Sequence, residues 1–405
     1  LNTFLGVDSG RDNTIGNNNT FIGTSTGKNN TDADNNVFLG VRSGQFNTIG
    51  SNNVFIGVDS GGDNVNGSNN VFIGESAGRS NQESSDNVFL GTLAGEQNTQ
   101  GSSNIFSGVK AGQFNNSGSN NVFMGTEAGR NNTDGNDNVF LGTAAGFSNT
   151  NGNNNVFIGY RAGENNTDKS NNVLIGNLAG LSNTSGTNNA VMGNGAANTL
   201  TSGDNNAIIG NNAGGALNAG NDNVVLGTEA GLGIVDGSRN IILGTLSAHD
   251  NDMTDTITIG TMSGFSLSGS NNVILGHSAG YSANTNNSVF LGIQSGKSAT
   301  GDNNVYVGNE SGATNENGAM NVFIGNRSGK LSKECDNNIF MGNDSGNNSS
   351  GDNNIFIGNQ SGSVSNGNGN VFIGNKSGES QLKGNNNTYL GDKAGGVGFH
   401  DFGNL

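Results

Sequence analysis

The sequence predicts an all-β protein: a parallel β-solenoid of about 24 rungs, with a period of about 16–17 residues per rung. Three observations predict this fold. A glycine recurs at a nearly fixed spacing, three β-forming residues precede most of these glycines, and Asn and Gly fill the segments between them. The chain has 405 residues, of which 71 are Gly, none is Pro and none is Trp. A short, strict period of this kind is typical of a solenoid, in which each repeat is one coil stacked on its neighbours.

The period is counted from the glycine that closes blocks such as "NNVFIG", which we number position 0. There are 24 such glycines from Gly6 to Gly391; seventeen of the intervals between them run from i to i+17 and six from i to i+16. We therefore expect one continuous solenoid over residues 1–391 and a C-terminal tail or partial cap over 392–405, with Phe399 and Phe402 as its apolar residues.

The character of the rung changes near residue 190, although the period does not break. Position +7 is Asn in the first eleven rungs, and the Phe at position −2 is then replaced by other residues for several rungs. Where Asn is lost from position +7, aliphatic residues take its place: Leu200, Leu217 and Ile234. We expect two sub-regions of one solenoid, about residues 1–190 and 191–391.

Each rung is expected to carry one short strand over positions −3 to −1, where three β-forming residues are bounded by turn residues. Helical repeats need about twice this length for two helices. Strands of neighbouring rungs should pair in parallel and in register at about 4.8 Å, so that 24 rungs would span roughly 115 Å.

The strand is apolar on both faces. Val or Ile at position −3 and Ile, Leu or Met at position −1 share one face, and Phe at position −2 points to the other. A Phe stripe in water would exceed the apolar patch of an ordinary monomer. We expect the aliphatic pair to fill the interior and the Phe stripe to contact another chain, through Phe55, Phe72, Phe89, Phe106, Phe123, Phe140 and Phe157.

The alternative arrangement places Phe inside the solenoid and the aliphatic pair outside. It also leaves one apolar face that needs a cover. Either arrangement therefore argues against a chain that works alone, and favours a homo-oligomer.

An asparagine column is predicted to form a structural ladder. Position −4 is Asn in 22 of 24 rungs, the exceptions being Thr256 and Ser288. Stacked identical residues can hydrogen-bond from rung to rung, and Asn tolerates the left-handed backbone of a sharp corner. The predicted ladder includes Asn53, Asn70, Asn87, Asn104, Asn121, Asn138 and Asn155.

Charge and composition exclude several classes of protein. The formal net charge is −16 and basic residues are interspersed among the acidic ones, which opposes nucleic-acid binding. No apolar run reaches the length of roughly 18 residues that a membrane-spanning helix needs, so no such helix is expected. Cys335 is the single cysteine, which excludes an intramolecular disulfide.

No catalytic or cofactor site is expected. The three histidines, His249, His277 and His400, lie at unlike places in the repeat, with no nucleophile or acid arranged around them. The segment "HDNDMTD" gathers Asp250, Asp252 and Asp255. Hard oxygen ligands suit Ca²⁺, but the segment lacks the Gly-rich nonapeptide of calcium-binding β-rolls, so a solvated acidic turn is the favoured interpretation.

An ice-binding solenoid is a minor alternative. It would need ranks of Thr at fixed positions, and position +1 does carry recurring threonines. Val41, Val58 and Val109 interrupt this rank. The threonines are Thr92, Thr126, Thr143, Thr228, Thr245 and Thr261.

The block "NNVFIG", followed by a short polar turn and "SG" or "AG", resembles the head repeats of trimeric autotransporter adhesins (YadA-like heads). It is also similar to repeats of bacteriophage tail fibres and Bacteroidetes surface proteins. The resemblance covers nearly the whole chain and implies a left-handed β-roll, a homotrimer, no enzymatic activity and a role in attachment outside the cell. The family's middle strand residue is usually small, whereas this chain has Phe.

Taken together, these features predict a non-enzymatic, elongated structural or adhesive fibre segment of a cell surface or phage tail fibre. It would act as a rigid spacer with a repetitive attachment surface for an unidentified receptor or glycan. We expect that surface on the variable turns that carry Arg42, Glu75, Lys110, Glu127, Tyr160 and Arg161. The start "LNTFLG" lies inside a rung, which favours either preceding sequence or end-to-end stacking; the alternative function is the subunit of a self-assembling extracellular filament.

Overall fold

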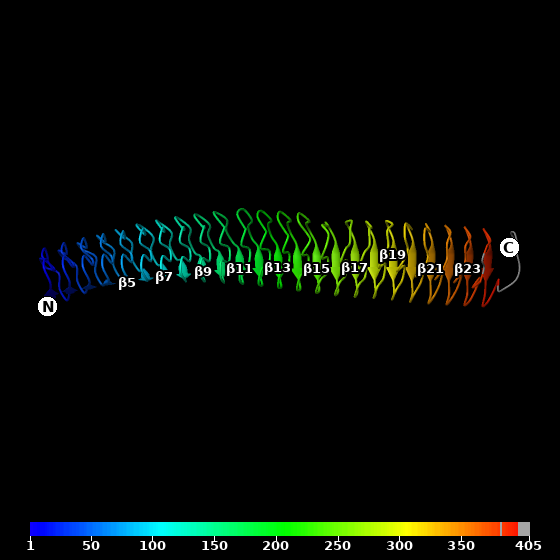
Figure 1. Ribbon diagram of the computed structural model, residues 1–405, viewed down its shortest axis with the longest axis horizontal. Helices are drawn as coiled ribbons and strands as arrows, with labels where there is room; N and C mark the ends of the chain where they lie inside the picture. Colours follow the sequence, from blue (N-terminus) through cyan, green and yellow to red (C-terminus); the bar gives the residue numbers. More distant parts are fainter. Residues whose placement is uncertain (381–382, 396–405) are drawn as a thin grey trace. The chain divides into compact units, whose positions relative to one another are not determined.

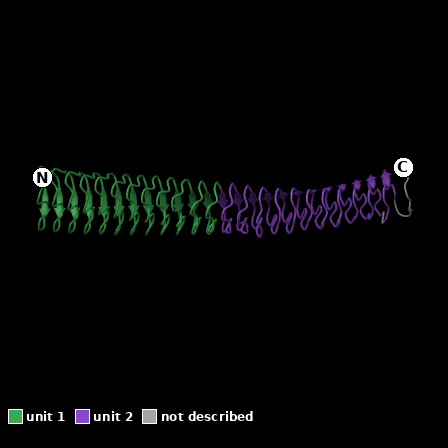
Figure 2. Ribbon diagram, turned by 90° about the horizontal axis from the view of Figure 1, so that it is seen from above, with its two compact units in different colours: residues 1–205 green, residues 206–405 purple. Residues whose placement is uncertain are grey.

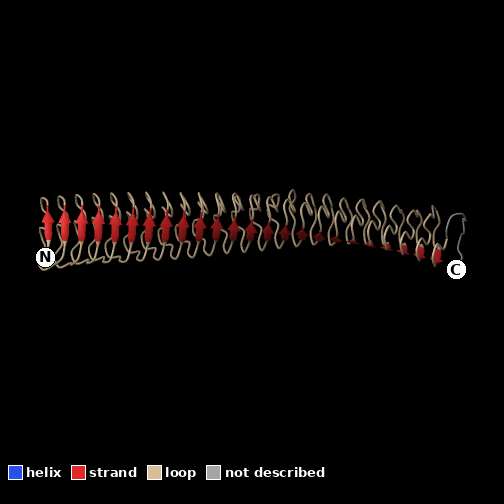
Figure 3. Ribbon diagram, turned by 90° about the horizontal axis from the view of Figure 1, so that it is seen from below, coloured by secondary structure: helices blue, strands red, loops and turns tan. Residues whose placement is uncertain are grey.

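The computed structural model describes residues 1–380 and 383–395. The chain divides into two compact units, Leu1–Asn205 and Asn206–Leu405, of which Figure 2 colours the described residues. Regular secondary structure in the described residues consists of strands (Figure 3). The predicted cap residues Phe399 and Phe402 lie outside the described residues. The expectation that residues 1–391 form one continuous solenoid stays a prediction.

Unit 1 contains twelve three-residue strands, which lie side by side in chain order (Figure 1). Each pairs in parallel with the next, and the register joins equivalent positions, as in Phe55↔Phe72 and Phe106↔Phe123. The strands are β1 (Thr3–Leu5), β2 (Thr20–Ile22), β3 (Val37–Leu39), β4 (Val54–Ile56), β5 (Val71–Ile73), β6 (Val88–Leu90), β7 (Ile105–Ser107), β8 (Val122–Met124), β9 (Val139–Leu141), β10 (Val156–Ile158), β11 (Val173–Ile175) and β12 (Ala190–Met192).

Unit 2 repeats this arrangement, again with parallel pairing of equivalent positions, as in Phe340↔Phe356. Its strands are β13 (Ala207–Ile209), β14 (Val224–Leu226), β15 (Ile241–Leu243), β16 (Ile257–Ile259), β17 (Val273–Leu275), β18 (Val289–Leu291), β19 (Val305–Val307), β20 (Val322–Ile324), β21 (Ile339–Met341), β22 (Ile355–Ile357), β23 (Val371–Ile373) and β24 (Thr388–Leu390). The predicted fold class, an all-β parallel solenoid of short rungs, is confirmed.

Glycines and asparagines turn the chain back on itself between strands. In the rung of β4, Gly57 has a φ of 137° and Gly61 a φ of 56°. The first value lies in a region that residues with a Cβ rarely adopt, which explains why position 0 is always Gly. Asn52 (φ 61°) and Asp59 (φ 56°) adopt the left-handed conformation as well. These short turns allow each rung to close within a single repeat.

Hydrogen bonds between rungs are not confined to the strands. Around the rung of β4, the backbone N–H groups of Asp59, Gly61 and Asp63 donate to carbonyls of neighbouring rungs at 3.0, 2.9 and 2.8 Å. Turn segments therefore satisfy their backbone groups through the next rung, as buried and half-buried backbone requires. Each rung depends on its neighbours for this, which is the physical basis of solenoid stability.

The Phe residues of position −2 lie inside the rungs, so the prediction that they contact another chain is wrong. All seven predicted interface residues have no exposed surface in a single chain. Their rings stack along the axis, with centroids 4.7–4.9 Å apart and interplanar angles of 5–8°. The corrected residues are Phe55, Phe72, Phe89, Phe106, Phe123, Phe140 and Phe157.

A glycine makes room for each ring. A Cβ added to Gly129 at position +4 would lie 2.5 Å from ring carbons of Phe123, closer than any real contact. Position +3 beside it is also small and buried, as in Ser60 and Ala77. The Ser60 hydroxyl donates to the carbonyl of Phe72 in the next rung at 3.0 Å. The small residues of positions +3 and +4 thus leave the space that the ring occupies.

The Asn column at position −4 is buried and joins each rung to the next, as its ladder prediction requires. In unit 2 the amides of this column bond to one another, as in Asn240 Nδ2 to Asn223 Oδ1 at 3.1 Å. Along most of unit 1 the bonds between rungs run from backbone to side chain. The backbone N–H of Asn121 donates to Oδ1 of Asn104 at 2.9 Å, and its own Nδ2 donates to the carbonyl of Gly135 at 2.8 Å. The same bonds recur along Asn53, Asn70, Asn87, Asn104, Asn121, Asn138 and Asn155.

In unit 1 a ladder of amide-to-amide hydrogen bonds lies at position +7. Asn115 Nδ2 donates to Asn98 Oδ1 at 2.6 Å, and Asn132 Nδ2 donates to Asn115 Oδ1 at 2.7 Å. From the second rung onward, both columns of unit 1 are buried. Among the described residues a single buried side-chain polar atom, Ser365 Oγ, lacks a hydrogen-bond partner. A polar interior of this kind is stable only because it is almost completely satisfied.

Candidate interaction surface

The outer face of the strands is an apolar stripe that repeats in every rung. It is formed by positions −3 and −1, which flank the buried ring. In unit 1, 21 of these 24 positions are aliphatic, the exceptions being Thr3, Thr20 and Ser107. Many are more than a third exposed, among them Val37 (41%), Leu39 (43%), Ile105 (43%) and Met124 (48%). The fold of unit 1 leaves this stripe uncovered.

The area of the stripe can be bounded. A fully exposed Val, Leu, Ile or Met side chain corresponds to roughly 60–120 Å², the ratio of its burial free energy to the area coefficient. At about one-third exposure, 21 such side chains present roughly 400–850 Å². The largest apolar patch of a typical monomer is about 300–600 Å², and a standard interface buries about 800 Å² per partner. The upper part of this range exceeds the patch of a typical monomer and reaches one side of a standard interface.

Unit 2 carries the same stripe on its own strands. There, 23 of the 24 positions are aliphatic, the exception being Thr388. Exposed members include Ile209 (45%), Leu226 (48%) and Ile339 (36%). Because both strand faces are apolar and the ring occupies the interior, the aliphatic pair is the face that needs a cover. The arrangement that the sequence left as the alternative is the one that the structure adopts.

Position +1 borders the stripe, and its chemistry varies along the chain. In unit 1 it adds exposed apolar groups such as Val58, Val109 and Tyr160. Near the end of unit 2 it becomes a surface ladder of side-chain amides, in which Asn326 Nδ2 donates to Asn343 Oδ1 at 2.8 Å. The threonines of this position point outward as well, which leaves the ice-binding alternative a prediction.

The charged turn residues at position +2 pair with one another along the stack. Arg42 donates two hydrogen bonds of 2.6 Å to the carboxylate of Asp59, and Arg327 donates two of 2.7 Å to Asp344. Hydrogen bonding from Arg42 lowers the pKa of Asp59 below its ordinary value. Charges predicted to serve attachment are thus partly engaged within the chain, including Arg161, which pairs with Glu164.

His249, Asp250 and Ser266 are the residue types of a catalytic triad, but their hydrogen bonds connect them in a different order. Its Nδ1 lies 2.5 Å from Asp250 Oδ1, and the Ser266 hydroxyl donates to Asp250 Oδ2 at 2.5 Å. Hydrogen bonds from Ser266 and then from His249 lower the pKa of Asp250. The carboxylate stands between the hydroxyl and the imidazole, whereas activation of a serine needs the imidazole beside the hydroxyl.

The three aspartates considered for Ca²⁺ are not brought together. Asp250 contacts His249 and Ser266, Asp255 pairs with Arg239 at 2.5 Å, and Asp252 lies beside the backbone N–H of Asp236. Within the described ranges, no group of three His, Cys, Asp or Glu side chains is placed to hold a metal ion. Of the other histidines, His277 is exposed at position +1, and His400 lies outside the described residues.

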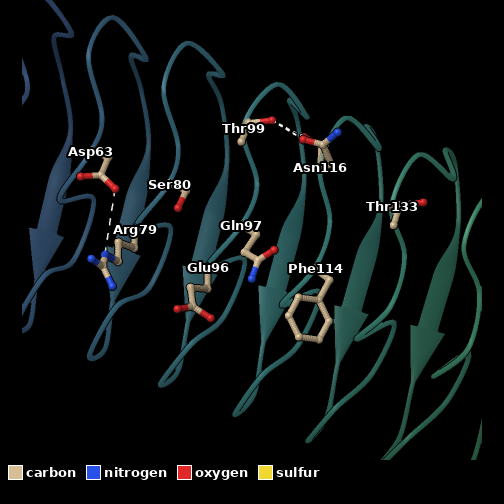
Figure 4. Close-up of a pocket in the computed structure, with 9 residues that line it drawn as sticks. All are labelled: Asp63, Arg79, Ser80, Glu96, Gln97, Thr99, Phe114, Asn116 and Thr133. Carbon is tan, nitrogen blue, oxygen red and sulfur yellow. Dashed lines mark hydrogen bonds and ion pairs between the residues drawn. The ribbon is translucent and has the colours of Figure 1, made fainter.

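A polar hollow on unit 1 was not predicted from the sequence. Its volume is about 490 Å³, and it spans the turn segments of five successive rungs (Figure 4). Positions +5 and +6 vary along the whole chain, and Phe46, Arg130 and Glu164 occupy them outside the hollow, so no repeated motif marks it. The lining residues are Asp63, Arg79, Ser80, Glu96, Gln97, Thr99, Phe114, Asn116 and Thr133.

Over residues 1–380 and 383–395 we find no helix whose length and hydrophobicity would let it cross a membrane. Comparison of the sequence with models of known protein families gives no match, and comparison with curated proteins gives none either.

Proposed function

We propose that this chain is a non-enzymatic structural and adhesive fibre segment that works outside the cell as an assembly of identical copies. The observation that carries the proposal is the uncovered apolar stripe of positions −3 and −1. A second copy of the chain presents the same stripe at the same spacing of about 4.8 Å. Burial of the two stripes against each other, or of three around one axis, would remove both from water.

The repetition itself supports a structural role. A catalytic site needs unlike groups that converge at one place, whereas the interior columns of Phe and Asn place like groups along a line. A line of like groups resists bending and presents many weak contacts, which gain strength through multivalency. The resemblance of "NNVFIG" to the head repeats of trimeric adhesins favours three copies and a location on a cell surface or virion.

The test is the mass of the assembly in solution. We expect light scattering to show three chains for the full-length protein. The triple variant Leu90→Lys, Met124→Lys and Ile158→Lys places three charges in the stripe and should release single, folded chains, because an unpaired charge in an interface costs several kcal/mol. The matched control, Asn66→Lys, Gln82→Lys and Gln100→Lys, adds the same charge on exposed turns and should keep the assembly.

Two results would change this proposal. A monodisperse single chain for the unmodified protein would contradict it. Fibres of indefinite length in electron micrographs would favour the second candidate, a filament subunit, in which the rungs of successive molecules pair end to end.

A further inference from the structure

The polar hollow of unit 1 is built from residues that the fold does not require. Its lining comes from positions +5, +6 and +8 of five successive rungs (Figure 4). Position +5 is Gly62 in the first of these rungs, and position +6 is Ser80 in the second and Ser148 outside the hollow. The larger Arg79, Glu96 and Phe114 occupy these positions elsewhere in the hollow. Because small residues suffice for folding, the large ones are free to serve a ligand.

Neighbouring side chains hold two of the lining residues in place. Gln113 Nε2 donates to Glu96 Oε2 at 2.8 Å, and Arg130 Nε donates to Gln113 Oε1 at 3.0 Å. The Arg130 guanidinium lies between two rings, 5.2 Å from the centroid of Phe114 and 5.6 Å from that of Phe147. This network fixes Phe114 and Glu96 before any ligand arrives, which lowers the entropy cost of binding.

The lining also offers polar groups for hydrogen bonds. The side chains of Ser80 and Gln97 make no hydrogen bond to any residue that the structure describes, and each lies at least partly exposed in the hollow. Asp63 and Arg79 lie 4.0 Å apart and offset each other's charge. The hollow thus combines one apolar ring with hydroxyl, amide and carboxylate groups, without a strong excess of one charge.

This combination selects a class of ligand. A sugar ring has an apolar C–H face that packs on an aromatic ring, and its hydroxyls both donate to carboxylates and accept from amides. A phosphate-bearing ligand would need a basic site, which this lining does not provide. Five rungs cover four spacings, about 19 Å along the stack, so the hollow accommodates a short linear chain rather than one sugar.

We propose that the hollow around Glu96 and Phe114 binds a neutral, linear oligosaccharide that lies along the stack of rungs. This site gives the proposed attachment function a ligand class. It rests on that function for its biological use only, because binding can be measured on the folded chain whatever its oligomeric state.

The test is calorimetric titration of the full-length protein with a panel of neutral hexasaccharides: cellohexaose, chitohexaose, xylohexaose and mannohexaose. We expect at least one to bind. Phe114→Ala and Glu96→Gln should each weaken that binding by about tenfold or more, equivalent to about 1.4 kcal/mol. The chain offers matched controls at the same repeat positions outside the hollow, Phe46→Ala and Glu164→Gln, which should leave the affinity within about twofold.

The outcomes separate this proposal from the proposed function. Absence of binding by every member of the panel, or equal losses from Phe114→Ala and Phe46→Ala, would overturn the oligosaccharide site. The light-scattering mass of the same samples reports on the assembly independently. An intact assembly without sugar binding would reject the hollow and leave the fibre proposal standing.

Discussion

The rungs of β4–β10 in unit 1 and those of β13, β14 and β16 in unit 2 share one backbone but differ inside. In the first group, each interior holds an aromatic ring at position −2 and an Asn amide at position +7. In the second group, position −2 holds no aromatic ring and position +7 holds no amide. Examples are Ile208 with Leu217 and Thr258 with Leu267. The glycine at position +4 nevertheless keeps the same φ, 56° in Gly61 and in Gly214.

Contacts of that glycine show what has been exchanged. A Cβ on Gly61 would lie 2.5 Å from the ring of Phe55, so the ring alone fills the space. A Cβ on Gly214 would lie 3.3 Å from Ile208 Cδ1 and 3.8 Å from Leu217 Cβ, so two aliphatic side chains share it. In the rungs of β13, β14 and β16, position −2 is smaller than Phe, and position +7 is larger than Asn and apolar. Conservation of interior volume of this kind is what close-packed cores tolerate best.

The rung of β19 shows that the two positions meet directly. There the ring is Tyr306, and its hydroxyl accepts a hydrogen bond from Asn315 at position +7. A buried tyrosine needs such a partner. Positions −2 and +7 therefore form one interior site, whose side chains can change while the backbone and the register stay constant.

The largest expected effect is the loss of a buried ring. Phe106→Ala should lower the free energy of unfolding by about 3–5 kcal/mol, because it removes a large side chain and leaves a cavity. Ile208→Ala should cost about 2–4 kcal/mol, since less volume is lost. Phe46→Ala is the control on the surface and should stay within about 0.5 kcal/mol. Urea unfolding followed by circular dichroism measures all three; equal, small losses for Phe106 and Phe46 would refute a buried ring.

A somewhat smaller loss is expected from the polar part of the interior. Asn121→Ala removes the acceptor of the Asn138 N–H (3.0 Å) and the donor to the Gly135 carbonyl. The Gly135 carbonyl keeps its hydrogen bond from Asn132 Nδ2 at 2.9 Å, so one buried N–H loses its partner. We expect this to cost about 1–3 kcal/mol. Asn121→Ser should cost less, because Ser288 Oγ accepts the equivalent N–H of Asn304 at 3.0 Å. The exposed control Thr126→Ala should change the free energy of unfolding by no more than about 0.5 kcal/mol. If it lost as much as Asn121→Ala, the hydrogen bonds of the ladder would not explain the effect of Asn121→Ala.

Unit 2 can be followed separately through its single thiol. Burial raises the pKa of Cys335 to about 12, whereas an unfolded thiol ionises near pH 8.5. The stability that follows from this difference is fully present below about pH 8.5 and is lost as pH rises toward 12. The loss in the free energy of unfolding reaches about 2 kcal/mol by pH 10. We expect Cys335→Ala to abolish this pH dependence because it removes the thiol. The variant should still fold, since Ala33 occupies the same repeat position. Rapid alkylation of the native thiol at pH 8 would show instead that Cys335 is accessible.

The sequence was sufficient for the fold because its period is strict. The position of every strand follows from the marker glycines, and the parallel register follows from stacking identical positions. Which face points inward could not be read from strand hydrophobicity, because residues such as Val122, Phe123 and Met124 are all apolar. The deciding signal is the Asn column: positions −4 and −2 point the same way in a strand, so a buried Asn121 requires a buried Phe123.

The candidate interaction surface could be predicted only in outline. An apolar face in need of a cover follows from the pattern, and the structure identifies it as the aliphatic pair. The hollow beside Phe114 could not be predicted, since its residues come from five rungs and form no repeated motif. Three-dimensional stacking alone brings Asp63 and Thr133 to the rim of one site.

A double-mutant cycle tests the central claim, that positions −2 and +7 share one interior site. Phe106→Ile leaves a cavity, and Asn115→Leu introduces more apolar bulk beside a full-sized ring, so each should lower the free energy of unfolding of the full-length chain. The double variant reproduces the combination found at Ile208 and Leu217. We predict that it is more stable than the sum of the single effects allows, with a coupling of about 1–2 kcal/mol. Additive losses would contradict the shared site.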